Sequence, residues 1–172
     1  EEFAELLDKL GRQQLTFVNT ASASGPFVEK LSGRDRIVIT ARKTGAERNA
    51  SVFGGHFVAA FADGAEEADQ NKDRRVSMLE AFVYARARVV QGYEAEGLLV
   101  TEHAILDDNG DGQGTDDPDP LAGDGVDGIL ARTLFFTSSV GREAEAAFPD
   151  AAAMWSGVTS PVVVTGSDVA PA

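Results

Sequence analysis

The stretch LTFVNTASASGPFVEKLSGRDRIVIT, residues 15–40, decides the fold class of this chain. Its first five residues are too few and too apolar for a helix, and residues 36–40 are largely β-branched, so each end predicts a buried strand. Between them, residues 26–31 supply a short apolar helix, with Pro26 suited to its first turn. A strand, a crossover helix and a second strand predict two parallel neighbours in an α/β sheet.

Further amphipathic segments flank this unit. Apolar residues within positions 3–10 repeat at helical spacing and predict a first helix that covers the sheet and ends near Gly11. Two more helices are predicted over residues 53–61 and 78–93, each with an apolar face. The predicted core is the set of residues whose periodicities point to one centre: Phe17, Val18, Ile37, Ile39, Phe53, Phe57, Phe82 and Val89.

The second half of the chain is predicted to be less regular. Residues 98–106 predict a strand or an extended arm, and residues 107–128 are too rich in Gly and Asp to form a regular element. Residues 130–136 predict a further strand, and residues 139–172 predict a weak Ala-rich helix and a low-complexity tail. We therefore expect a partial α/β domain over residues 1–138, followed by this tail.

Composition and net charge limit the kinds of molecule that we expect this chain to bind. The chain has 172 residues, 43% of them hydrophobic, which fits one globular domain with a substantial core. Its 28 acidic and 15 basic residues give a net charge of −13, which repels phosphate backbones and anionic membrane surfaces and favours cations or basic partners. We therefore expect no nucleic-acid partner.

Several absences also bear on function. The chain has no cysteine, which excludes disulfides, thiolate metal sites and thiol catalysis by this polypeptide. No stretch approaches the ~20 apolar residues that span a bilayer, so no membrane segment is expected within this chain. The acidic start lacks both Met and the pattern of a signal peptide, which predicts a truncated N-terminus and leaves the cellular location open.

The segment DQNKDRRVSMLE, residues 69–80, is the sharpest local motif. It links two predicted helices, and its oxygen-bearing residues follow the spacing by which a twelve-residue EF-hand loop surrounds Ca²⁺. Hard oxygen ligands suit a hard cation. The predicted ligands at positions 1, 3, 5, 7, 9 and 12 are Asp69, Asn71, Asp73, Arg75, Ser77 and Glu80.

Two features of this loop favour a different interpretation. Position 6 is Arg74, where an EF-hand loop normally has Gly because φ is positive, and another residue there costs about 1–2 kcal/mol that the ion would have to offset. Ser77 and Glu80 also match a capping box, so a solvated turn that caps the next helix explains them equally. The sequence leaves both interpretations open: a calcium site of weak to moderate affinity, and a capped turn.

A second acidic loop repeats part of this spacing. Asp107, Asn109, Asp111 and Gly112 stand at positions 1, 3, 5 and 6, here with the required Gly. Position 12 is Pro118, so a closing carboxylate would have to come from a neighbouring aspartate. Ion binding and a flexible acidic loop both remain open for this segment.

Serines in the turn after the first strand are the candidate nucleophiles. Ser22 and Ser24 lie in that turn, and His56 and His103 are the chain's only histidines. A serine needs such a base within hydrogen-bond reach. Because His56 lies on a helix whose aromatic face points to the core, a structural or surface role is the favoured interpretation for it.

Taken in order, residues 16–64, 69–89 and 101–112 resemble the caspase-like group of bacterial peptidase homologues, which is related to caspases, metacaspases and legumains, including C13-like peptidases. The resemblance spans residues 5–136. In that family a strand ends in Asp-Ala-Cys-x-Ser-Gly, and the cysteine is the nucleophile. Here the corresponding residues read TASASG, so the resemblance places Ser22 at the nucleophile position.

Three other segments carry the same resemblance. Residues Thr40 to Glu47 match a loop that lies beside the family's substrate groove, and Phe53, Gly54 and Phe57 match a Phe-Gly-x-x-Phe helix. Residues 69–81 match an acidic insertion before a helix bearing Glu-Ala. The resemblance implies a three-layer α/β sandwich with a mostly parallel central sheet.

The resemblance also implies that part of the domain is missing. The family's catalytic His and further parallel strands precede the strand at residues 15–19, so this fold would be incomplete at its N-terminal side. That strand would then have an unpaired apolar edge, which the missing half of the domain or a protein partner would cover.

The leading hypothesis is a non-catalytic peptidase homologue, a calcium-stabilised binding or structural module with Ser22 as a degenerate nucleophile. The alternative is a working hydrolase or peptidase. It would use Ser22, with Ser24 and Gly25 near the oxyanion, or a nucleophile and His from an upstream segment or a partner chain.

Overall fold

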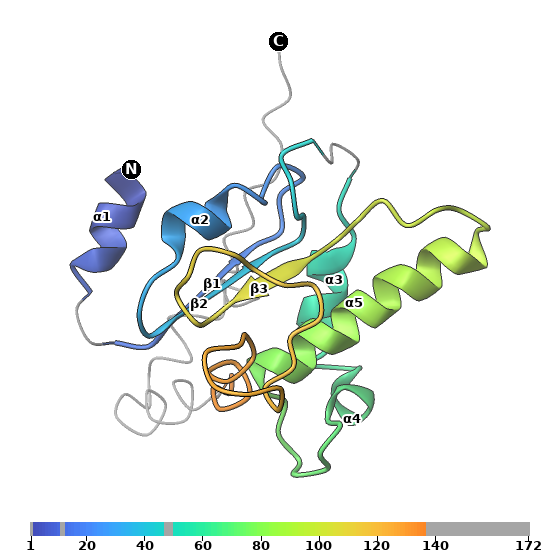
Figure 1. Cartoon of the computed structure of the whole chain (residues 1–172). Coiled ribbons are helices and arrows are strands. Elements are labelled where there is room, and N and C mark those ends of the chain that lie inside the picture. Colours follow the sequence, from blue (N-terminus) through green and yellow to red (C-terminus); the bar gives the residue numbers. More distant parts are fainter. Residues whose placement is uncertain (1, 11–12, 47–49, 137–172) are drawn as a thin grey trace, which may run out of the picture.

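The computed structural model describes residues 2–10, 13–46 and 50–136, which form a mixed α/β arrangement of helices around a small sheet (Figure 1). The helices are α1 (Glu2–Asp8), α2 (Phe27–Leu31), α3 (Phe53–Ala59), α4 (Ala65–Ala68) and α5 (Met78–Ala95). The strands are β1 (Leu15–Asn19), β2 (Arg36–Thr40) and β3 (Ile105–Asp107). The predicted unit of strand, short helix and strand is therefore confirmed as β1, α2 and β2.

The described sheet has three strands in the order β1-β2-β3. Strands β1 and β2 are parallel, with Phe17 opposite Val38. Strand β3 is the end of the predicted arm at residues 98–106, and it runs antiparallel to β2, with Leu106 opposite Ile39. The described sheet is thus mixed, with one parallel and one antiparallel pair.

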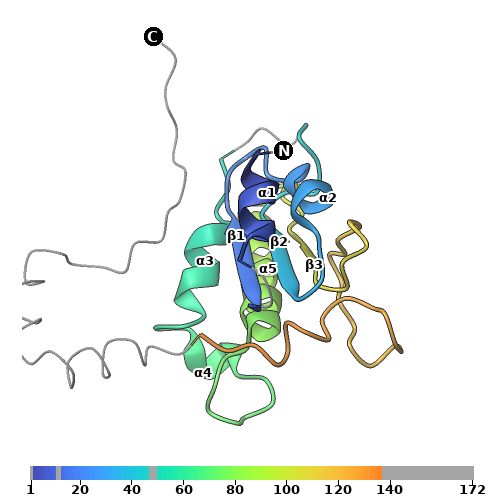
Figure 2. The ribbon, with the colours of Figure 1, turned by 90° about the vertical axis from the view of Figure 1, so that its left-hand side faces the viewer.

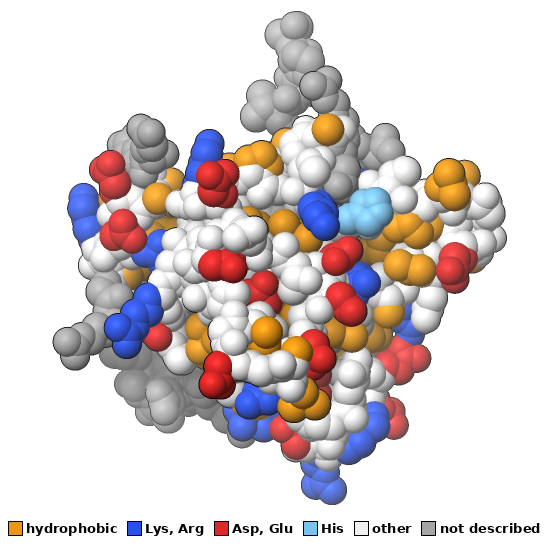
Figure 3. Space-filling view, in the orientation of Figure 1, with side chains coloured by type: hydrophobic (Ala, Val, Ile, Leu, Met, Phe, Trp, Pro, Cys, Tyr) orange, Lys and Arg blue, Asp and Glu red, His pale blue; other side chains and the backbone are white. Residues whose placement is uncertain are grey.

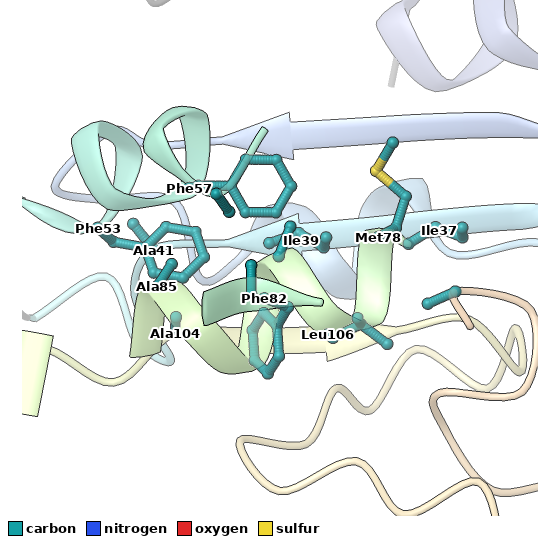
Figure 4. Packing of buried hydrophobic residues seen from close by; sticks show 14 of the residues in the cluster. Ile37, Ile39, Ala41, Phe53, Phe57, Met78, Phe82, Ala85, Ala104 and Leu106 are labelled. Atoms are coloured by element: carbon teal, nitrogen blue, oxygen red, sulfur yellow. The ribbon is translucent and has the colours of Figure 1, made fainter. Parts of the chain in front are cut away.

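Helices cover both faces of this sheet, because successive residues of β2 point to opposite sides. Ile37 and Ile39 belong to the main core, which α3 and α5 complete (Figure 4). Val38 points the other way and packs with Val28 and Leu31 of α2. Figure 2 shows α3 and α2 on opposite sides of β1.

Most of the predicted core is buried. Buried residues among those predicted are Ile37, Ile39, Phe53, Phe57, Phe82 and Val89. Phe17 and Val18 are half-buried instead, because β1 lies at one end of the strand order and has a described strand neighbour on one side. The prediction of a buried strand at residues 15–19 is therefore wrong for β1, which is half-buried along its whole length.

Two predicted elements differ in the structure. Helix α1 ends at Asp8 rather than near Gly11, and Phe3, Leu6 and Leu10 are 47%, 51% and 47% exposed. Residues 130–136 form turns and one β-bridge instead of a strand, because they fold back on themselves through bonds such as Arg132 N–H to the Gly128 carbonyl. The turn leaves Leu130 and Leu134 packed against the main core.

The weak helix and tail expected over residues 139–172 lie outside the described residues. Among the helices that the structure does describe, none is both long enough and apolar enough to cross a membrane.

Candidate functional site

Backbone amides and acidic side chains hold the first acidic loop, residues 69–80, in a compact turn. The Asp69 carboxylate accepts hydrogen bonds from Asp73 N (3.1 Å) and Arg74 N (2.9 Å). The Asn71 side-chain oxygen accepts from Asp73 N (2.8 Å), and the Asp73 carboxylate accepts from Arg75 N (2.8 Å). Positions 1, 3 and 5 of the predicted ion loop therefore each fix the backbone that follows them.

At the end of this loop, Glu80 takes part in a helix cap and also contacts the first residues of the loop. Ser77 is the N-cap of α5 and forms a capping box with Glu80, as the capped-turn interpretation requires. The Glu80 carboxylate also accepts from Gln70 N (3.1 Å) and Asn71 N (3.3 Å), at loop positions 2 and 3. Position 12 thus folds back against the beginning of the loop, which a helix cap alone does not need.

The second acidic loop repeats three of these bonds at the same offsets, and its position-1 carboxylate accepts from position 4 instead of position 5. The Asp107 carboxylate accepts from Gly110 N (3.0 Å) and Gly112 N (3.0 Å). The Asn109 side-chain oxygen accepts from Asp111 N (2.8 Å), and the Asp111 carboxylate accepts from Gln113 N (2.7 Å). Both loops therefore share three bonds. The amide of position 5 donates to the side chain of position 3, that of position 6 to the side chain of position 1, and that of position 7 to the side chain of position 5.

Backbone dihedrals match as well. Positions 4 and 6 have positive φ in both loops, at 62° and 69° for Lys72 and Arg74 and at 83° and 77° for Gly110 and Gly112. The second loop uses glycine at both positions, where positive φ carries no steric cost, whereas the first loop holds two long side chains in the same conformation.

Asp127 closes the second loop, a residue that the sequence prediction missed. Its carboxylate accepts from Asp108 N (3.0 Å) and Asn109 N (3.3 Å), again at positions 2 and 3. Of the neighbouring aspartates, Asp117 instead forms an ion pair with Arg86. Asp127 therefore occupies the place in the second loop that Glu80 occupies in the first, from well beyond the twelve-residue window.

Asp108 reciprocates this contact. Its carboxylate accepts from Gly128 N (2.8 Å) and Ala131 N (2.7 Å), so each side chain holds the other segment's backbone. Burial raises the pKa of Asp127 to about 6, and the negative charge of Asp107 adds to the shift. Burial also raises the pKa of Asp108, against the opposing effect of its bonds to Ala131 and Gly128.

The donor chemistry of both loops suits a hard cation, although their carboxylates face the loops' own amides. Acidic side chains are spread across the visible face in Figure 3 rather than gathered at one point. Within residues 2–10, 13–46 and 50–136, no three acidic or histidine side chains converge closely enough to hold a metal ion. Each carboxylate oxygen that accepts one N–H bond still has a second lone pair for a cation.

The turn after β1 places Ser22 as predicted relative to its strand. Ser22 is half-buried and follows the carboxyl end of β1, although β1 is an edge strand here. The Asn19 side-chain oxygen accepts from Ala21 N (3.0 Å), which fixes the turn. Ser24 is fully buried and its hydroxyl accepts from Arg42 N (3.2 Å), so Ser24 ties the turn to the end of β2.

His56 does not complete a catalytic pair with Ser22 in the part of the chain that the structure describes. His56 lies on α3 and lines a hollow of about 370 Å³ with Arg88 and Tyr93 of α5. His103 is exposed, and no hydrogen bond joins Ser22 to His56 among the described residues. Ser22 and His56 therefore do not form the pair that activates a serine nucleophile.

A buried polar network next to this turn was not predicted. The Glu102 carboxylate accepts from Val52 N (3.1 Å), Phe53 N (3.1 Å) and the Ser51 hydroxyl, which caps the start of α3. The buried Arg42 guanidinium lies 3.9 Å from Glu102 and donates to the carbonyls of Thr101 (2.6 Å) and Ala50 (3.0 Å). Most of these bonds go to backbone groups, and they tie the residues after β2 and before β3 to the start of α3.

Comparison with protein-family models, with curated protein sequences and with solved structures gives no match for this chain.

Proposed function

We propose that this chain is a non-catalytic binding or structural module of the caspase-like group, stabilised by Ca²⁺ in its two acidic loops. One observation carries the proposal. Both loops share three internal hydrogen bonds and their positive φ positions, and in both a carboxylate accepts from the amides of positions 2 and 3. Both loops have Asp, Asn and Asp at positions 1, 3 and 5, and they keep the same turn although positions 4, 6 and 12 differ.

The bound ion would be held by oxygen atoms. In the first loop the ligands are those predicted from the sequence, namely Asp69, Asn71, Asp73, Arg75, Ser77 and Glu80. In the second they are Asp107, Asn109 and Asp111, and we add Asp127 because its carboxylate accepts from the amides of positions 2 and 3. Calcium would supply positive charge that offsets the repulsion among these carboxylates, and it would thereby stabilise both loops.

The module would act by binding rather than by hydrolysis. Ser22 replaces the cysteine of the resembled family, and no hydrogen bond joins it to His56 in the described part of the chain. The half-buried edge of β1 and the exposed apolar residues of α1 support a protein partner or a further segment of the same domain on that side.

Thermal unfolding in excess EGTA and in millimolar calcium tests this proposal. A ligand that binds the folded state alone at about 100 times its Kd adds about 2.7 kcal/mol of stability, so we expect the melting temperature to rise by several degrees. Asp69→Asn combined with Asp73→Asn keeps acceptors for the loop amides but removes two charges, and should reduce the rise.

A matched control separates this effect from general charge removal. Asp63→Asn combined with Glu94→Gln removes two exposed carboxylates outside both loops and should leave the calcium-induced rise intact. An unchanged melting temperature of the wild-type chain in calcium would leave residues 69–80 as a capped turn and contradict the proposal.

A further inference from the structure

A hollow of about 350 Å³ lies between the end of α3, the first acidic loop and residues 135–136. Its lining includes Arg74 and Arg75 of the loop and three aromatic residues, Phe61, Phe135 and Phe136. In a chain of net charge −13, a hollow with two neighbouring guanidinium groups is an exception to the surrounding acidity. The hollow uses the guanidinium group of Arg75, whereas the ion proposal uses an oxygen atom of that residue.

Both arginines are exposed and lack a carboxylate partner among the described residues. By contrast, Arg36, Arg86 and Arg88 each pair with an acidic side chain. The Arg75 guanidinium stacks on the Phe135 ring, with its Cζ atom 3.5 Å from the ring centroid. Stacking fixes the plane of the guanidinium and leaves its N–H groups available at the edge, which pre-organises a fork for an anion.

Arg74 is held at a backbone position that favours glycine. Its φ is 69°, and the equivalent residue of the second loop is Gly112 at 77°. Glycine at this position would remove the backbone strain, so the presence of arginine is a reason to look for a function of its side chain. Here the side chain lines the hollow beside Arg75.

The other wall is aromatic and partly uncovered. The rings of Phe61 and Phe136 lie 5.6 Å apart between centroids, and Phe136 is 64% exposed. An exposed aromatic side chain at the rim of a hollow is a suitable contact for an apolar group of a ligand. The hollow therefore offers two cations and an apolar wall within the space of one or two amino-acid residues.

Negative charge near the two arginines limits which ligands the hollow can bind well. The carboxylates of Asp69 and Asp73 accept from the backbone amides of Arg74 and Arg75, so negative charge lies beside the backbone from which both guanidinium groups extend. That charge weakens the attraction of a bare anion such as acetate or phosphate. A ligand must add apolar contact to bind well.

We propose that this hollow binds the C-terminal carboxylate of a polypeptide whose last residue is aromatic. The carboxylate would receive N–H bonds from Arg74 and Arg75, and the terminal ring would lie against Phe136 and Phe61. The preceding residues of the peptide would extend over the exposed rim. No ion is needed for this contact, so the inference stands apart from calcium binding.

Two-dimensional amide NMR titration of the isotope-labelled chain in EGTA tests the assignment. The probe is acetyl-Gly-Gly-Ser-Phe with a free C-terminus, compared with the same peptide as its C-terminal amide and with 3-phenylpropionate. We expect the acid to shift the amide signals of Val76, Phe135 and Phe136. The amide, which loses the charge-assisted bonds, and phenylpropionate, which lacks the peptide, should each bind at least about tenfold more weakly.

Variants separate this site from non-specific attraction. Arg75→Gln should weaken the acid at least about tenfold, and the exposed Arg34→Gln should leave it unchanged. Arg74→Gly should raise the melting temperature by relieving the positive φ, yet weaken binding, so a loss of binding cannot be ascribed to unfolding. Equal binding of acid and amide, equal binding of phenylpropionate, or undiminished binding by Arg75→Gln would each overturn the assignment.

Discussion

Ser22 illustrates how little a single side chain does without its neighbours. Its hydroxyl stays protonated near neutral pH unless a base removes the proton, and no hydrogen bond joins it to His56 among the described residues. We expect a fluorophosphonate probe to leave the chain unlabelled while labelling an active serine hydrolase in the same tube. Labelling that Ser22→Ala abolishes would favour the hydrolase alternative instead.

Asp127 is the residue whose titration should affect stability most clearly. Its pKa is raised from 3.8 to about 6 in the folded chain, so the folded state binds the proton more tightly than the unfolded state. Its contribution to the free energy of unfolding is therefore present in full below the unfolded pKa and is lost as the pH rises through about 6.

Replacing this carboxyl by an amide tests that sign. Asp127→Asn keeps an oxygen for the amides of Asp108 and Asn109 but has no charge to bury. We expect the free energy of unfolding to rise by about 1–2 kcal/mol near pH 7.5 and to change little near pH 4, in urea titrations with EGTA. An increase of the same size at both pH values would exclude ionisation as the cause.

At the scale of the elements, close packing of α3 against the end of β1 rests on one glycine. A Cβ added to Gly54 would lie 2.8 Å from the Thr20 side chain, whereas a Cβ on Gly55 would meet nothing within 4 Å. We expect Gly54→Ala to lower the free energy of unfolding by about 1–3 kcal/mol through overpacking. Gly55→Ala should raise it by about 0.5–1 kcal/mol, because alanine favours the helix. Urea denaturation of both variants would settle the point, and equal effects would refute the packing argument.

The elements that could be predicted are those whose signal is local. Strands β1 and β2 follow from short β-branched or apolar runs, and α5 follows from its apolar spacing and the Ser77 cap. Residues 130–136 were misassigned because their apolar run looks like a strand. Their conformation instead depends on bonds to a distant segment, through Asp108 and the Ser77–Phe135 bridge.

The candidate site likewise has parts that a local sequence pattern predicts and parts that it does not. The sequence indicates both acidic loops because their Asp and Asn residues follow one another at fixed spacing within twelve residues. Asp127 was missed because it reaches Asp108 and Asn109 from 18 or 19 residues away. No local pattern marks such a contact, and the buried network of Arg42 and Glu102 was hidden for the same reason.

At the scale of the whole molecule, one segment connects the two acidic loops. Asp108 of the second loop holds the amides of Gly128 and Ala131. A few residues later, the Leu134 carbonyl accepts from Met78 N (2.9 Å), and Phe135 bridges to Ser77 of the first loop. Residues 127–135 thus span both loops, and order gained in one should be passed to the other.

The measurement that tests the central claim most directly is a calorimetric calcium titration of the chain and two loop variants. The account predicts two ions for the wild-type chain. It predicts one ion for Asp69→Asn with Asp73→Asn, and one for Asp107→Asn with Asp127→Asn, because each pair removes charge from one loop. Absence of binding at millimolar calcium, or a stoichiometry that neither pair changes, would contradict the account.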